Sequence, residues 1–215
     1  MNCCTPITSD TGRLFTWFVI PQRLRFQLFG FEKTQRQLID AIKHAGLKGS
    51  EVLEIGCGTG YLHQALLKAG AIHARGVDLS AGMLTEARRA ANETGLQTRT
   101  DYRLGDFVQL ADDIPDADIT ILDKVVCCYP DWEPLLDRSL TKTRRIYALT
   151  FPRDRRLTQV GSRLLQWGMG LINCCYQPYI HDPESIQQHI LGHGFQQSHQ
   201  SITTSWYTQV YVRIE

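Results

Sequence analysis

Three glycines alternate with other residues directly after a short apolar run, in the segment Glu54-x-Gly56-x-Gly58-x-Gly60. Glycine permits a tight turn and lets a ligand approach the backbone, because it has no Cβ. If a helix follows this turn, its first N–H groups and the positive end of its dipole face whatever lies over the turn. The spacing therefore predicts a site for a ligand that carries an anionic group or a carboxylate.

Two common nucleotide-binding patterns do not match this loop. The dinucleotide fingerprint GxGxxG would require a third glycine at position 61, where the chain has Tyr61. The P-loop pattern would end in GK[ST], and no such sequence closes this loop. Hydrolysis of a nucleoside triphosphate consequently has no lysine in place.

Acidic residues follow three later apolar runs, in "GVDLS" (Asp78), "LGDF" (Asp106) and "ILDKVVCCYPD" (Asp123). A carboxylate about 20 residues after a glycine turn can accept hydrogen bonds from ribose hydroxyls, which is the role we predict for Asp78. Asp78 and Asp106 could also be helix caps, and glycines after a strand are often plain turn formers. Together, their order along the chain favours a ligand site.

Strands and helices alternate along the chain, which predicts a parallel sheet covered by helices on both faces. Ser80 and Asp182 are predicted helix N-caps, the second with proline at the first helical position. The strand at 117–126 is the most apolar, so we expect it to be central. The expected strands are 51–55, 73–80, 100–107, 117–126, 144–152 and a closing hairpin within 195–215. The expected helices are 59–70, 81–95, 131–140 and 182–194.

Two regions fall outside this alternation, residues 1–46 and residues 153–180. Additions to a parallel sheet usually lie at the carboxyl ends of the strands, where ligands bind. We therefore predict one domain over residues 1–215, with 1–46 as an N-terminal helical lid and 153–180 as an insertion near the acceptor site. Aromatic residues in both regions suit an enclosed pocket: Phe15, Trp17, Phe18, Trp167 and Tyr176.

Composition restricts the partners. The chain has 23 Lys+Arg, 22 Asp+Glu and a formal charge of +1, so it lacks the basic field that a nucleic-acid backbone would require. No apolar run approaches the roughly 18 residues of a membrane span. The first residues lack the basic region of a signal peptide, so a cytoplasmic location is expected.

Six of the seven cysteines occur in adjacent pairs: Cys3-Cys4, Cys127-Cys128 and Cys174-Cys175. Adjacent cysteines rarely cross-link a fold, and the CxxC spacing of zinc ribbons is absent, which favours reduced thiols and predicts no metal site. If the pairs converged on one pocket, soft thiols could instead hold a metalloid or sulfur compound.

The four motifs together resemble the class I S-adenosylmethionine-dependent methyltransferases over about residues 50–150. The resemblance implies a Rossmann-like α/β fold, a doubly wound, seven-stranded, mostly parallel sheet whose last strand is antiparallel. It also implies S-adenosylmethionine as cofactor. The cofactor-binding positions carried over from the family are Glu54, Gly56, Cys57, Gly58, Gly60, Asp78, Leu79, Met83, Gly105, Asp106, Phe107, Asp123 and Lys124.

The phrase "LDKVVCCYPD", with "FPRD" further on, is similar to a bacterial subgroup grouped with the magnesium-protoporphyrin O-methyltransferases. Methyl transfer to a small molecule is thus expected, with oxygen as the favoured acceptor atom, for example in a carboxylate. Because the sulfonium already activates the methyl group, the enzyme mainly has to align the acceptor and exclude water. The predicted catalytic residues are Tyr129, Asp131 and His181.

Further candidates on the acceptor side are basic: Lys124, Arg153, Arg155 and Arg156. They would suit a substrate that bears a carboxylate, although a solvated helix start would also explain the arginines. Two other functions stay open: an S-methyltransferase acting on a thiol or metalloid compound, and a non-catalytic regulatory protein that binds S-adenosylmethionine. The acceptor molecule and the oligomeric state are not readable from the sequence.

Overall fold

A seven-stranded sheet forms the centre of the structure, a computed structural model that describes residues 19–154 and 179–214. Its strand order is β3-β2-β1-β4-β5-β7-β6. The strands from β1 to β5 pair in parallel, whereas β7 is antiparallel to both β5 and β6. The strands are β1 (Glu51–Ile55), β2 (His73–Asp78), β3 (Thr100–Leu104), β4 (Ala117–Asp123), β5 (Thr143–Pro152), β6 (Phe195–Ile202) and β7 (Trp206–Arg213). The predicted sheet, including its antiparallel last strand and its central fourth strand, is confirmed.

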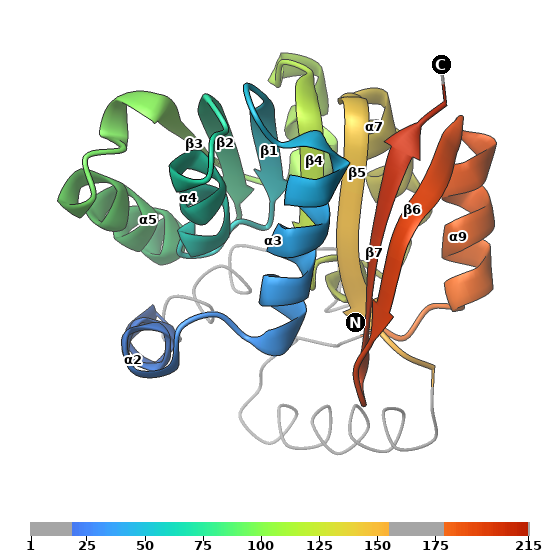
Figure 1. The fold of residues 1–215 in the computed structure, drawn as a ribbon, viewed down its shortest axis with the longest axis horizontal. Coiled ribbons are helices and arrows are strands. Elements are labelled where there is room, and N and C mark those ends of the chain that lie inside the picture. Colours follow the sequence, from blue (N-terminus) through green and yellow to red (C-terminus); the bar gives the residue numbers. More distant parts are fainter. Residues whose placement is uncertain (1–18, 155–178, 215) are drawn as a thin grey trace, which may run out of the picture.

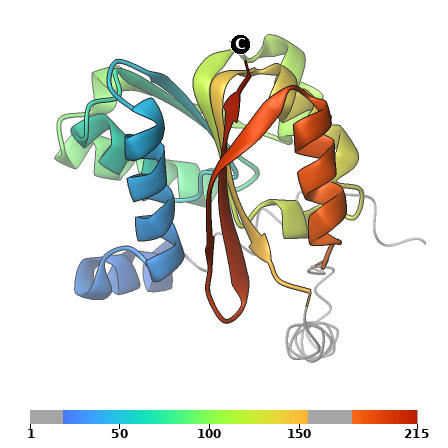
Figure 2. The ribbon, with the colours of Figure 1, turned by 45° about the vertical axis from the view of Figure 1, so that its right-hand side comes forward.

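Helices cover both faces of this sheet, as Figures 1 and 2 show. The longer helices are α2 (Val19–Phe29), α3 (Lys33–Gly46), α4 (Tyr61–Lys68), α5 (Ala81–Glu93), α7 (Glu133–Thr141) and α9 (Pro183–Gly192). The short ones are α6 (Phe107–Leu110) and the 3-10 turns η1 (Gln97–Arg99), η2 (Ala111–Asp113) and η3 (Val126–Cys128). Among the described residues, no helix is both long enough and apolar enough to cross a membrane.

The apolar core is split into two layers by the sheet. Val52 of β1 contributes to the layer under α3 and α4, whereas its neighbour Leu53 contributes to the layer under α7 and α9. This alternation follows from the pleat, because successive side chains of a strand point to opposite faces. The central strands are therefore apolar on both faces, as expected of a parallel sheet that helices cover on both sides.

The predicted helix caps are confirmed. The side chain of Ser80 accepts a hydrogen bond from the backbone N–H of Met83 at 3.3 Å, and that of Asp182 accepts one from Ser185 at 2.9 Å. The fourth strand is shorter than predicted, because Lys124 has a φ of 62°. A residue in the left-handed region cannot continue a strand, so β4 ends at Asp123 and a 3-10 turn follows.

The region before β1 divides into two parts where it is described. Helix α3 packs on β5 and β7 and so covers the sheet. Helix α2 instead lies at the edge where the parallel strands end, at the lower left of Figure 1. The helical lid predicted for 1–46 stays a prediction, since 1–18 lie outside the described residues, as do 155–178 of the predicted insertion.

Candidate functional site

The glycine loop between β1 and α4 depends on left-handed backbone at three positions. Gly56, Gly58 and Gly60 have φ values of 64°, 52° and 72°, a region that residues with a Cβ rarely adopt. A Cβ at Gly56 would lie 2.5 Å from a methyl carbon of Val125, and one at Gly60 would lie 2.9 Å from the ring of His63. At Gly58, by contrast, nothing lies within 4 Å. The loop is therefore closely packed at Gly56 and Gly60 and open next to Gly58, as a loop that binds a ligand requires.

The carboxylate of Asp78 holds this loop in place. One oxygen accepts a hydrogen bond from the N–H of Gly58 at 2.8 Å, and the other accepts one from the N–H of Ser80 at 2.8 Å. Burial raises the pKa of Asp78, although both backbone N–H groups favour the ionised form. Each oxygen keeps acceptor capacity, so ligand hydroxyls could still bind here.

Glu54 does not line the surface of the loop, in contrast to the role carried over for it. Its carboxylate is 3% exposed and accepts a hydrogen bond from Nδ1 of His63 at 2.5 Å. The other ring nitrogen of His63 lies 3.0 Å from the hydroxyl of Tyr102, which also accepts from Gln64 at 3.1 Å. Burial raises the pKa of Glu54. This buried network supports the loop from beneath.

Three of the predicted cofactor-binding residues have side chains in the core. Cys57 is buried, and a Cβ on Gly76 would lie 2.6 Å from its Sγ. Burial raises the pKa of the Cys57 thiol well above its ordinary value, so it is not a nucleophile. Met83 and Phe107 are 2% and 1% exposed. From these positions only the backbone could reach a ligand, whereas Leu79 is half-buried beside Asp78.

Asp106 and Tyr129 are in direct contact. Asp106 follows Gly105, whose φ is 143°, and caps α6 by accepting a hydrogen bond from the N–H of Val108 at 3.0 Å. The same carboxylate oxygen accepts one from the hydroxyl of Tyr129 at 2.7 Å. Burial first, and then the charge of Asp106, raises the pKa of Tyr129 far above its ordinary value. Tyr129 therefore stays protonated and cannot serve as a general base.

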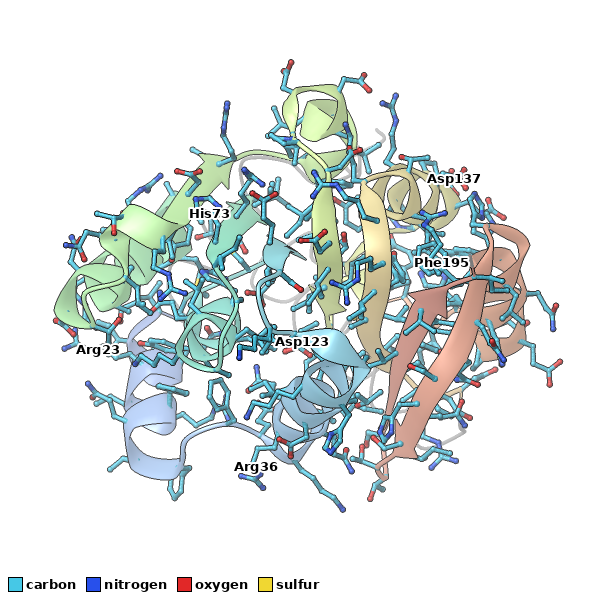
Figure 3. The ribbon with its side chains drawn as sticks, turned by 45° about the horizontal axis from the view of Figure 1, so that its top comes forward. Arg23, Arg36, His73, Asp123, Asp137 and Phe195 are labelled. Atoms are coloured by element: carbon cyan, nitrogen blue, oxygen red, sulfur yellow. The ribbon has the colours of Figure 1, made fainter. Side chains whose placement is uncertain are left out.

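Asp123 and Lys124 lie at the end of β4, and Figure 3 labels Asp123 next to helix α3. One oxygen of Asp123 accepts from the side chain of Gln35 at 2.9 Å, and the other accepts from the hydroxyl of Thr150. Lys124 is the only non-glycine residue with positive φ in the described ranges 19–154 and 179–214. Strain of this kind persists only where the surroundings enforce it and concentrates at functional sites.

The side chain of Lys124 links the segment before α3 to β7. Its ammonium forms an ion pair with Glu32 and lies 5.2 Å from the ring centroid of Trp206. Burial would raise the pKa of Glu32, but the hydrogen bond and charge of Lys124 and the charge of Arg25 hold it below its ordinary value. The positive charge of Lys124 thus lies over the ring of Trp206 and is paired with the carboxylate of Glu32.

His181 contacts the backbone of the loop after β4. Its Nε2 lies 2.9 Å from the carbonyl oxygen of Tyr129 and therefore donates to it, and the neighbouring N–H of Tyr179 donates to the carbonyl of Cys127 at 2.8 Å. Burial lowers the pKa of His181. These contacts make it a residue that positions the loop. The third predicted catalytic residue, Asp131, is exposed.

Aromatic cover at the start of α4 comes from a residue that the sequence did not single out. The ring of Phe26 stacks on Tyr61 at a centroid distance of 4.0 Å, and the Tyr61 hydroxyl donates to Glu86 at 2.8 Å. Apolar and aromatic residues in the segment before β1 gave a general signal for a covering element. No feature of the sequence identified Glu86 of α5 as the partner of Tyr61.

Arg153 anchors the hairpin of β6 and β7. Its guanidinium donates to the carbonyl of Thr203 at 3.0 Å and lies 5.3 Å from the ring centroid of Tyr207. Arg155 and Arg156 lie outside the described residues, as do Cys3, Cys4, Cys174 and Cys175. Convergence of the three cysteine pairs on one pocket therefore stays a prediction. Of these pairs, Cys127 and Cys128 are described, in the turn after β4 with their thiols facing the carbonyl of Lys124.

Part of the chain is similar in sequence to known methyltransferases. Residues 52–146 match the family described as "Methyltransferase domain". A ubiquinone biosynthesis O-methyltransferase of Actinobacillus pleuropneumoniae is 46% identical over 70 residues, which span 31% of this chain and 29% of the relative. A second, from Azorhizobium caulinodans, is 39% identical over 87 residues, 40% of this chain and 33% of the relative. The matches therefore cover about a third of either chain.

Solved structures share the fold over nearly the whole chain. Magnesium protoporphyrin IX methyltransferase from Synechocystis PCC 6803 with bound SAH has a TM-score of 0.72 at 21% identity, covering 96% of this chain and 100% of its own. The [4+2]-cyclase SpnF has a TM-score of 0.71 at 14% identity, covering 97% of each chain. The match of residues 52–146 to a methyltransferase domain agrees with the family predicted from the motifs, over less than half of the chain. At these identities the structures show the fold alone.

We expect Gly56→Ala to lower the free energy of unfolding by about 2 to 4 kcal/mol. The left-handed backbone costs about 1 to 2 kcal/mol with a Cβ, and the contact with Val125 adds overpacking. Gly58→Ala is the matched control, because it has the same kind of φ but open space. Denaturant unfolding measures both variants, and equal losses would contradict the packing argument.

We expect Lys124→Gly to be more stable than Lys124→Ala by about 1 kcal/mol. Both variants remove the ion pair with Glu32, but only alanine has to hold a Cβ at a φ of 62°. Thermal or denaturant unfolding of the two proteins gives the difference. If alanine were as stable as glycine here, the loop after β4 would have relaxed and would not be enforced by its surroundings.

Proposed function

We propose, on the premise that residues 52–146 belong to the class I S-adenosylmethionine-dependent methyltransferases, that this chain binds S-adenosylmethionine and transfers its methyl group to an oxygen of a small molecule. The curated relatives named above are O-methyltransferases by name. They support oxygen as the acceptor atom, and they match only part of the chain. The choice of acceptor atom is thus an inference of our own.

The observation that carries this proposal is the placement of Asp78. Its carboxylate fixes the Gly58 amide and keeps acceptor capacity next to the open side of the loop. A ribose offers hydroxyl donors that such a carboxylate can bind, and the amino acid carboxylate of the cofactor suits the N-terminal end of α4. Asp106, half-buried one strand away, supplies an acceptor for an adenine amino group. The donor set of the site fits this cofactor.

The cofactor supplies a methyl group already activated by the positive sulfonium. The task left to the chain is to align the acceptor and to exclude water, which raises the rate without a strong base. Tyr129 and Asp106 hold the turn after β4 through their hydrogen bond, and His181 holds it from the other side. These residues keep the wall of the site rigid.

The acceptor is proposed to be an anionic small molecule bound beside Lys124. This ammonium lies at the end of the central strand, over Trp206 and between the elements that would enclose a substrate. A carboxylate of the substrate could replace Glu32 as its partner, in a site where charge pairs are only partly exposed to water. Nucleic acid stays outside the proposal, since the chain has a formal charge of +1.

Cofactor binding is tested through Asp78. We expect Asp78→Asn to weaken S-adenosylhomocysteine by about 1 to 3 kcal/mol in titration calorimetry, because a hydrogen-bond acceptor for the ribose is lost. Asp113→Asn on the exposed turn η2 is the matched control. Thermal unfolding establishes that both variants are folded.

The affinity for S-adenosylhomocysteine should also depend on pH. Burial raises the pKa of Asp78 above 3.8, and only the ionised form accepts through both oxygens. Affinity should therefore fall as the pH is lowered through that raised pKa, relative to the Asn variant, which lacks this titration. Parallel profiles of wild type and Asp78→Asn would contradict the role of Asp78.

Transfer itself is tested by S-adenosylhomocysteine release with matched acceptors that carry a carboxylate, a phenol or a thiol. We expect turnover with an oxygen acceptor. Lys124→Asn, which tolerates the left-handed backbone, should raise KM for a carboxylate acceptor about tenfold. Glu32→Gln should lower that KM, because it frees the ammonium and keeps a side chain able to cap α3.

Each result separates the functions considered. Turnover with thiols only would replace the oxygen acceptor by sulfur. Tight cofactor binding without turnover over the whole panel would favour a regulatory role, and because a [4+2]-cyclase shares this fold, the fold alone does not establish methyl transfer. No binding of S-adenosylhomocysteine would remove the proposal altogether.

A further inference from the structure

Two histidines and an aspartate meet between α7 and α9, apart from the strand ends that form the candidate site. They are Asp137 of α7, His189 of α9 and His193 directly after α9, and their ligand atoms all lie within 4.8 Å of one another. His189 and His193 are four residues apart, so they lie on one face of the helix. Figure 3 shows Asp137 well away from Asp123. We propose that these three residues form a structural Zn²⁺ site.

The hydrogen bond behind His193 is the second observation in favour of a cation. Its Nδ1 lies 2.8 Å from the carbonyl oxygen of His189, and because a carbonyl only accepts, Nδ1 carries the hydrogen. When Nε2 carries no hydrogen, its lone pair is directed at Asp137, whose Oδ1 is 3.3 Å away. Two facing acceptors require either a proton or a metal cation between them, and the metal titration below distinguishes the two. Metal-binding histidines typically donate their second N–H to a carbonyl or carboxylate in this way.

The spacing of the three side chains suits tetrahedral zinc. Bonds of about 2.0 to 2.1 Å place neighbouring ligand atoms about 3.3 Å apart in a tetrahedron. His193 and Asp137 are already at 3.3 Å, and His189 at 2.7 Å from the same oxygen would move outward by about 0.6 Å. The side chain of Asp137 is 51% exposed and can adjust. Two imidazoles and one carboxylate are ligands that Zn²⁺ accepts, with water in the fourth position.

Such a site would join two helices on the same face of the sheet. Asp137 belongs to α7, which precedes β5, whereas both histidines belong to the region of α9. The ring of Trp132, before α7, already contacts His189 edge-on at 5.2 Å. The segment leading into α9 contains His181, which holds the loop after β4. Zinc would thereby stabilise the support of the candidate site without taking part in its chemistry.

The metal site is tested on tag-free full-length protein that has been treated with chelator and dialysed. Zn²⁺ titration calorimetry should give micromolar or tighter binding, and His189→Asn and His193→Asn should each weaken it at least tenfold. His199→Asn on β6 is the matched control, because this histidine is exposed and lies near Gln37 and Asp40 of α3, which covers the opposite face of the sheet from α7 and α9. A Cys127→Ser, Cys128→Ser double variant separates thiol binding from the proposed site and should keep the affinity.

Two further measurements exclude trivial explanations. Co²⁺ bound at the site should give visible absorption without the thiolate charge-transfer band. Zn²⁺ should raise the Tm of wild type and leave that of His193→Asn unchanged, with equal Tm values in chelator showing that the variant is folded. The proposal is overturned if Zn²⁺ does not bind, if both histidine variants bind like wild type, or if only the cysteine variant loses the metal. Asp137→Asn gives an independent test should a histidine variant fail to fold.

Discussion

The carboxylate of Asp78 is the interaction on which the candidate site depends. It accepts hydrogen bonds from two backbone amides that belong to different turns, Gly58 in the turn after β1 and Ser80 in the turn after β2. The two turns therefore have fixed positions relative to each other, and so do the helices that follow them. Without this carboxylate the two amides would lose an ionised partner, which costs more than the loss of a neutral one.

A buried polar network supports the same loop from inside. Glu54 and His63 are both fully or almost fully buried, and burying a carboxylate is unfavourable unless it is paired and hydrogen-bonded. The hydroxyl of Tyr102 and the amide of Gln64 complete the chain of donors and acceptors. Because each member has a partner, the network fixes where α4 begins. Gly60, packed against the ring of His63, leaves no room for another arrangement.

Much of the fold could be predicted from the sequence because it rests on local signals. Apolar periodicity gave the order of strands and helices, and Ser80 and Asp182 are caps that act within three residues. The end of β4 was misjudged because "DKVV" continues an apolar run, and nothing local shows that Lys124 adopts positive φ. That conformation depends on partners far along the chain, namely Glu32 and Thr150.

The site could be predicted only in part for the same reason. Motif spacing placed Asp78 and Asp106 at strand ends, where the structure has them. It also assigned Glu54 to the ligand, although His63, nine residues later, occupies its carboxylate. The cluster of Asp137 and the two histidines was missed, since its ligands come from segments 52 residues apart. The spacing of His189 and His193 on one helix was the available signal.

The sheet divides the candidate site into two halves with different demands. The glycine loop, Asp78 and Asp106 lie at the ends of β1, β2 and β3, and they are the residues proposed to bind the cofactor. Lys124, Arg153 and Trp206 lie at the ends of β4 and β5 and at the start of β7, on the side where the acceptor is proposed to bind. Because a [4+2]-cyclase shares this fold, the fold alone does not determine the reaction, and the residues of the site have to be argued separately.

Lys124 is where these two halves meet. It follows directly on Asp123 at the end of the central strand, its left-handed backbone ends that strand, and its side chain reaches Trp206 of β7. The side chain of this strained residue is held by Glu32 and Trp206. Because Glu32 also caps α3, any substrate that takes its place at Lys124 must act on the segment before α3 as well. If the acceptor binds as proposed, its binding and the position of helix α3 would therefore be coupled through this one ion pair.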